Sequence, residues 1–348
     1  MNGLAPPEPA NPDGATDGSV VDAHVHALPL SLLEQATQGE IDGVSAAPSA
    51  DGYLVTLPGL PQPKLVRPGM ISTQKRAAWA LGQGVTRQIV APWLDAQPTA
   101  AMAPAAARDW ARRLNAALAE QEDGNGVLAS VALTGHAAQD LDEAVTKDGM
   151  AGLILSTSPA GLSGLADPAL EPLWEAAAGL GIPVVLHPPT DGPARLLPDG
   201  DKFGNTFGRL VDTTFAVTSL LLTAVLDRHP ALRLVVVHGG GFLPYQSLRL
   251  DGGHRADALS AHAIGRDHPS DYLPDLYFDT VAMKPAAIRL LAESAGPEHV
   301  LLGSDYPFPL GDRAPVATVQ AAGLGQQATA DVLGGNAIRL FGTGSDLG

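Results

Sequence analysis

Eight short segments rich in valine, leucine and isoleucine recur along this chain, and each is followed by a segment of helical character. The strand-like segments are residues 19–26, 86–93, 126–133, 151–157, 183–188, 232–240, 276–281 and 299–307. Nearly continuous apolar runs are typical of parallel strands that are buried on both faces. Eight units of strand and helix predict an α/β fold of the (β/α)8 TIM-barrel type, for which 348 residues is a normal length.

The alternative architecture for this alternation is a doubly wound open sheet. The first strand is not followed by Gly-x-Gly-x-x-Gly, and no phosphate-binding loop is present, which disfavours that alternative. Helix signals support the barrel units: Ser72 is a predicted N-cap, and Gly82 or Gly84 a predicted end of the same helix. The helical segment near residues 243–260 has the least regular pattern.

A long insert, residues 27–71, separates the first strand from its helix and is rich in glycine and proline. Its sequence predicts an irregular conformation. Long loops in compact domains usually have a function or are disordered. Because the insert follows the strand that bears two histidines, we predict that it forms a small lid over the barrel mouth. Residues 1–18 and 343–348 are expected to be tails, the first disordered, and residues 19–342 to form one barrel domain.

The composition excludes several classes of function. A formal net charge of −16 argues against binding to nucleic acid or to an anionic membrane, although the local field of a site can still attract a small anionic substrate. The sequence contains no run of eighteen apolar residues and no signal-peptide pattern at its N-terminus, so a cytoplasmic protein is expected. Cysteine is absent, so any metal must be held by His, Asp or Glu.

Polar residues end several of the predicted strands. His24 and His26 lie two residues apart and therefore share one face of the first strand. His187, His238 and Asp305 end the fifth, sixth and eighth strands. The carboxyl ends of barrel strands meet at one rim, where catalytic groups lie. Imidazole and carboxylate groups together suit zinc or another borderline divalent metal.

Each of these residues also has a plainer explanation. A single histidine at a strand end is often a hydrogen-bonded structural residue, and Asp305 before Tyr-Pro could simply start a turn. The coincidence of five such residues on one rim favours a catalytic site instead. Other histidines, such as His229 and His268, lie in polar sequences and are expected at the surface.

The segments DAHVH, VVLHP, VVVHGGGFLPY and LLGSDYPFPLGD resemble the amidohydrolase superfamily in order and spacing. They are most similar to the branch that contains aminocarboxymuconate-semialdehyde decarboxylase and the resorcylate-type decarboxylases. The resemblance implies one divalent metal, usually zinc and in some members manganese, held by His24, His26, His187 and Asp305. It also implies that His238 acts as acid and base beside the metal, and that Asp305 takes part in catalysis.

The fourth strand indicates one metal ion and not two. Members of the superfamily with two metals commonly carry a bridging carboxylated lysine at the end of this strand. Here the strand continues as AGLILSTSP, and the nearest lysines are Lys147 and Lys202.

The resemblance also suggests residues that bind a substrate carboxylate. An arginine in the family's insert aligns loosely with Lys64 or Arg67, and a family arginine that reaches the neighbouring subunit's site aligns with Arg249. The last alignment implies a homodimer. The chain departs from the family at Pro189, where the decarboxylase usually has a tryptophan that walls the pocket.

Three functions are compatible with the sequence. The first is non-oxidative decarboxylation of an unsaturated or aromatic carboxylic acid. The second is hydrolysis or hydration of a lactone, a cyclic amide or a ring-fission product. The third is a metal-binding or ligand-binding barrel without catalysis, which has no need of His238 in addition to the four metal ligands.

Overall fold

The computed structural model describes residues 18–256 and 264–342, and the structural statements below concern these residues. Eight strands form one parallel sheet in the order β1-β5-β6-β7-β8-β9-β10-β11. Their bounds are β1 (Val21–Ala27), β5 (Arg87–Pro92), β6 (Gly126–Ala129), β7 (Gly152–Ser156), β8 (Pro183–His187), β9 (Arg233–Val236), β10 (Leu276–Asp279) and β11 (Val300–Leu301). The predicted α/β TIM barrel is confirmed.

The segment after β11 closes the barrel against β1. The backbone N–H of Ala23 donates to the carbonyl of Leu302 at 2.8 Å, and that of His26 donates to the carbonyl of Tyr306 at 2.8 Å. Regular strand structure is limited here to Val300–Leu301, although the sequence predicted residues 299–307. The chain leaves the extended conformation at Asp305, whose φ is +60°.

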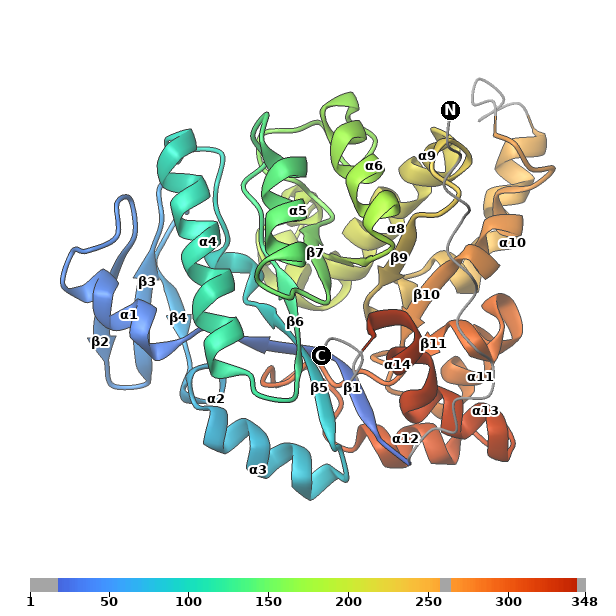
Figure 1. Cartoon of the computed structure of the whole chain (residues 1–348). Helices are drawn as coiled ribbons and strands as arrows, with labels where there is room; N and C mark the ends of the chain where they lie inside the picture. Colours follow the sequence, from blue (N-terminus) through green and yellow to red (C-terminus); the bar gives the residue numbers. More distant parts are fainter. Residues whose placement is uncertain (1–17, 257–263, 343–348) are drawn as a thin grey trace, which may run out of the picture.

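Helices pack around the outside of the sheet (Figure 1). The longer ones are α3 (Thr73–Gln83), α4 (Pro104–Gln121), α5 (Ala137–Thr146), α6 (Glu171–Leu180), α8 (Arg209–Leu222), α10 (Leu243–Arg255) and α11 (Pro285–Ala295). Shorter helices are α7 (Gly200–Phe203), α9 (Val225–Arg228), α12 (Pro315–Ala321), α13 (Gln326–Ala330) and α14 (Asn336–Phe341). As predicted, Ser72 caps α3 by accepting a hydrogen bond from the N–H of Lys75 at 3.2 Å, and Gly84 ends it in the left-handed conformation.

The insert has regular structure, so the prediction of an irregular segment was wrong. It contains α1 (Leu30–Thr37), an antiparallel sheet of β2 (Ser45–Ser49), β3 (Gly52–Thr56) and β4 (Lys64–Val66), and α2 (Pro68–Ile71). Pro48 and Gly52 lie at positions that are compatible with the pairing of these strands. Pro48 lies in the edge strand β2, and a Cβ at Gly52 would lie 2.1 Å from the carbonyl oxygen of Val66.

A second hydrophobic cluster joins the insert to the barrel. Leu33, Val55 and Met70 of the insert share this cluster with Trp93 after β5 and Trp110 of α4. In Figure 1 the small sheet lies beside α4, on the side toward which β1 points. The insert therefore packs at the carboxyl end of the strands. Its action as a lid remains a prediction.

The predicted tails, apart from Gly18, and the end of the 243–260 helical segment lie outside the described residues. Within residues 18–256 and 264–342, no helix has both the length and the apolar character needed to cross a membrane.

Candidate metal centre and adjoining cavity

The barrel brings together four side chains that are far apart in the sequence. His24 and His26 come from β1, His187 ends β8, and Asp305 follows β11. One nitrogen or carboxylate oxygen from each lies within 4.8 Å of the others, and all four residues are buried. The Nε2 atoms of His24 and His26 are 3.1 Å apart, and each lies 3.3 Å from Oδ1 of Asp305. We call this set the four-residue cluster.

Unpartnered atoms within the four-residue cluster fit a bound cation. The Nδ1–H of His187 donates to the carbonyl of Pro188 at 2.9 Å, which leaves the Nε2 lone pair free, and that atom is buried without a hydrogen-bond partner. Oδ1 of Asp305 is also buried and makes no hydrogen bond. Buried polar atoms rarely stay unpaired. Three imidazole nitrogens and one carboxylate oxygen suit one divalent metal ion.

The protonation states of His26, His187 and Asp305 agree with this fit. Burial would lower the pKa of His24, but the nearby carboxylates of Asp305 and Asp279 raise it, so a bound metal would have to displace the proton from this ring. Burial lowers the pKa of His26 to about 4 and the pKa of His187 well below its usual range, so both rings are neutral at pH 7. Burial would raise the pKa of Asp305, but the charge of His24 and the nearby His238 ring lower it well below the ordinary value. Metal ligands must be deprotonated in this way.

Asp279, at the end of β10, orients His24 and was missed in the sequence. Its Oδ2 accepts a hydrogen bond of 2.6 Å from Nδ1 of His24, so that Nε2 faces the four-residue cluster. Its Oδ1 accepts from the N–H groups of Gly239 and Val281 at 2.8 and 3.1 Å. The signal was present, because Asp279 is also a polar residue that ends an apolar strand.

Replacing Asp279 by asparagine should lower the metal affinity by about 10- to 100-fold, because carboxylates that orient a ligating histidine commonly contribute that much. Competition with a chromophoric chelator measures the affinity. Asp251→Asn is the matched control, since Asp251 is a buried aspartate that binds Ser270 away from the four-residue cluster. Equal metal affinity in the Asp279 variant and the control would contradict this role.

His238 lies beside the four-residue cluster. Its Nε2 is 3.6 Å from Oδ2 of Asp305, and its ring centroid is 5.1 Å from that of His187. Its Nδ1 is buried without a hydrogen-bond partner. The backbone of His238 is left-handed, with a φ of +56°, which costs energy for a residue other than glycine.

The three glycines after His238 make this turn feasible. Gly239, Gly240 and Gly241 have φ values of +61°, +76° and +64°. A Cβ at Gly240 would lie 2.7 Å from the ring of Phe278, and one at Gly241 would lie 2.5 Å from the carbonyl oxygen of Leu210. Side chains at these positions would therefore clash with their surroundings, and glycine relieves both this clash and the left-handed strain.

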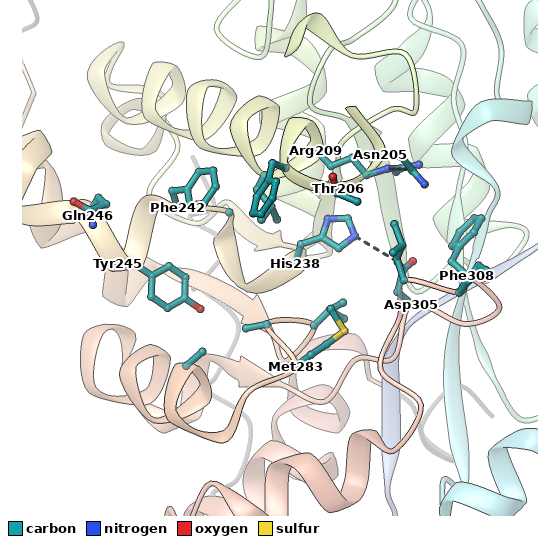
Figure 2. Close-up of a pocket in the computed structure, with 18 residues that line it drawn as sticks. Asn205, Thr206, Arg209, His238, Phe242, Tyr245, Gln246, Met283, Asp305 and Phe308 are labelled. Carbon is teal, nitrogen blue, oxygen red and sulfur yellow. Dashed lines mark hydrogen bonds and ion pairs between the residues drawn. The ribbon is translucent and has the colours of Figure 1, made fainter. Parts of the chain in front are cut away.

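A cavity of about 580 Å³ opens beside His238 and Asp305. Figure 2 shows His238 between Tyr245 and Asp305, with Phe242, Met283 and Phe308 around them. Most of the lining is apolar. Its polar side chains belong to Asn205, Thr206, Arg209, His238, Tyr245, Gln246 and Asp305.

The three predicted substrate-binding residues lie outside the lining of this cavity. Lys64 is buried, and its Nζ pairs with Oδ2 of Asp191 at 2.5 Å. Arg67 precedes α2 and Arg249 lies on α10, and both are exposed. Their binding of substrate remains a prediction. Among the described residues, Arg209 is the cation that lines the cavity. No sequence pattern indicated it, because it begins a helix and does not end a strand.

Comparison with known proteins agrees with the motifs of the sequence. The family model described as Amidohydrolase matches residues 21–343. The chain belongs to the amidohydrolase family. This confirms the family resemblance carried by the histidine motifs.

Relatives of this amidohydrolase have names that describe decarboxylases. It is 28% identical over 210 residues to 2-amino-3-carboxymuconate-6-semialdehyde decarboxylase of Dictyostelium discoideum, with 59% of this chain and 56% of that protein matched. It is 30% identical over 224 residues to gamma-resorcylate decarboxylase of Rhodococcus jostii, with 58% and 67% matched. The chain therefore matches little more than half the length of the Dictyostelium protein.

A solved structure supports the fold of the amidohydrolase. The 5-carboxyvanillate decarboxylase of Novosphingobium aromaticivorans, with bound manganese, superimposes with a TM-score of 0.78 at 19% identity. The superposition covers 93% of this chain and 97% of the other.

Proposed function

We propose that this amidohydrolase is a metal-dependent, non-oxidative decarboxylase of an unsaturated or aromatic carboxylic acid. One observation carries the proposal: Asp305, a member of the four-residue cluster, and His238 line the same largely apolar cavity of about 580 Å³. Cavities of this size and lining are typical of sites for small organic ligands. The decarboxylase names of its relatives support the reaction class.

His24, His26, His187 and Asp305 would hold one metal ion. When bound, a divalent metal stabilises negative charge on substrate oxygen atoms. We propose zinc as this metal because three nitrogen donors and one carboxylate are a common zinc set. Manganese is the alternative, because the Novosphingobium neighbour binds it.

The chain's own catalytic task is the transfer of one proton. A proton is added to the carbon that bears the carboxylate, and the bond from this carbon to the carboxyl group then breaks. The electron pair of that bond stays on the carbon and restores the conjugated system, while CO₂ leaves. His238 Nε2 and Asp305 Oδ2, which lie 3.6 Å apart at the cavity wall, would hold and deliver the proton.

A panel of carboxylic acids incubated with metal-loaded protein tests the reaction class. The proposal expects CO₂ or bicarbonate release and loss of the acid, measured by headspace analysis and chromatography. Ring opening of lactones or cyclic amides, without CO₂ release, would replace it with the hydrolase alternative. We also propose that the substrate is a small anion and that the protein is cytoplasmic. The chain would form a homodimer in which Arg249 reaches the neighbouring site, and the insert would act as a lid.

Elemental analysis of the purified, metal-replete protein should give one divalent metal ion per chain. The reason is that the four-residue cluster supplies one set of donors and β7 ends without a lysine. Two equivalents per chain, or none, would contradict the single-metal site.

A further inference from the structure

Arg209 is the only arginine or lysine among the described residues that line the cavity. Its Nε donates to Oδ1 of Asn205 at 2.7 Å, its Nη1 to the carbonyl of Pro188 at 2.9 Å, and its Nη2 to Oγ1 of Thr190 at 2.8 Å. All three acceptors are neutral. Within the described part of the chain, no carboxylate pairs with this half-buried guanidinium.

Other cations that are shielded from solvent do pair with acids. Lys64 pairs with Asp191, and Arg108 pairs with Asp140 at 2.7 Å. The chain does not lack acids, because its net charge is −16. The nearest acid to Arg209 along its hydrogen bonds is Asp95, which accepts from the Thr190 hydroxyl and does not contact the guanidinium directly. A partly desolvated cation without a direct counter-ion is costly, and an anionic ligand would offset that cost. The guanidinium of Arg209 is therefore available to a ligand in a way that Lys64 is not.

Arg209 also lies close to the four-residue cluster. The carbonyl oxygen of Pro188 accepts hydrogen bonds both from Nη1 of Arg209 and from Nδ1 of His187, so a single oxygen atom separates the guanidinium from this imidazole. In Figure 2, Arg209 and Asn205 lie on the same side of His238 as Asp305. Arg209 and Asp305 also line the same cavity, so a ligand bound there lies beside both.

The guanidinium retains the donors that a carboxylate needs. Arginine has five N–H groups, and the three bonds to Asn205, Pro188 and Thr190 use one on each nitrogen. One N–H remains on Nη1 and one on Nη2. Each of these N–H groups can donate a charge-assisted hydrogen bond to a carboxylate oxygen. The bonds to Asn205, Pro188 and Thr190 hold the guanidinium in one orientation.

We propose that Arg209 binds the carboxylate of the substrate, so that the cavity selects aromatic acids over neutral rings of the same shape. The inference rests on the proposed function and names a specificity residue for it. It differs from the sequence-based assignment, which gave this task to Lys64, Arg67 or Arg249. The apolar side chains of Phe242, Met283 and Phe308 would contact the ring.

Calorimetric titration of the zinc-loaded protein with salicylate and with salicylamide tests the proposal. These probes have the same shape and differ in charge. Arg209→Met should weaken salicylate binding by about 10- to 100-fold, as expected for the loss of charge-assisted hydrogen bonds. Salicylamide binding should change less than about threefold. Arg209→Lys, which keeps the charge but loses the planar guanidinium and its anchored donors, should bind salicylate with an affinity between those of wild type and Arg209→Met.

Arg233→Met is the control, because Arg233 is exposed at the start of β9, at the opposite end of the barrel. Metal content and melting temperature of each variant show whether it remains folded and loaded. Equal weakening of both probes in Arg209→Met would indicate a structural role and overturn the proposal. Wild type that binds salicylamide as well as salicylate, or binds neither, would also overturn it. If salicylate selectivity depends on Arg209 but no acid is decarboxylated, the proposed function fails and the carboxylate site stands.

Discussion

Replacing His187 by alanine should remove the metal and abolish turnover while the barrel stays folded. His187 supplies one of the four donors, and its Nε2 is a buried atom with no other partner. The remaining donors, two histidines and Asp305, would leave a more open site of lower affinity. The fold should persist because the apolar cluster between the strands and the outer helices does not include His187. Elemental analysis, CO₂ release and far-ultraviolet circular dichroism on one preparation measure the three outcomes.

A chelator experiment makes this prediction sharper. A ligand that binds only the folded state stabilises it, by about 2.7 kcal/mol at a free concentration 100 times its Kd. Chelation should therefore lower the melting temperature of the wild type and leave that of His187→Ala unchanged. His229→Ala is the control. His229 follows α9, pairs with Glu171 and lies outside the four-residue cluster, so this variant should respond to the chelator like the wild type. A His187→Ala protein that keeps its metal would show that the ligand set is wrong.

The sequence located the four-residue cluster because a barrel follows simple rules. Apolar runs of strand length identify the eight strands, and a parallel barrel gathers their carboxyl ends at one rim. His24, His187 and Asp305 could therefore be expected to meet although up to 281 positions separate them. Asp279 obeys the same rule and could have been found, since it ends β10 in the same way.

Other parts of the site depend on contacts that sequence patterns do not encode. The insert was predicted to be irregular because glycine and proline are uncommon in strands. Its three short strands depend on pairing with one another, which the local sequence pattern does not show. Lys64 seemed free to bind substrate, but its partner Asp191 lies 127 positions away. Arg209 seemed an ordinary helix residue, and its position at the cavity follows only from the packing of α8 near the end of β8.

Replacing His238 by asparagine should leave the metal in place and reduce turnover by about 10²- to 10⁴-fold, which is the usual contribution of a positioned acid or base. Asparagine is the informative choice because His238 has a φ of +56°, a conformation that asparagine tolerates better than alanine. The backbone and the three glycines after it should then keep their places. Single-turnover rates and metal content of the same preparation measure the effect.

The plainer alternative is that His238 braces the end of β9. The contacts of the ring argue against a brace, because Nδ1 has no hydrogen-bond partner and Nε2 is 3.6 Å from Asp305, beyond hydrogen-bond distance. A bracing residue would lower the melting temperature when replaced and leave turnover per folded molecule nearly unchanged. An acid or base would do the reverse, lowering kcat with little effect on metal content or melting temperature. His299→Asn makes the same chemical change before β11, away from the cavity, and should alter none of these quantities. A metal-loaded His238→Asn protein with normal kcat would remove His238 from the reaction and assign the delivery of the proton to Asp305.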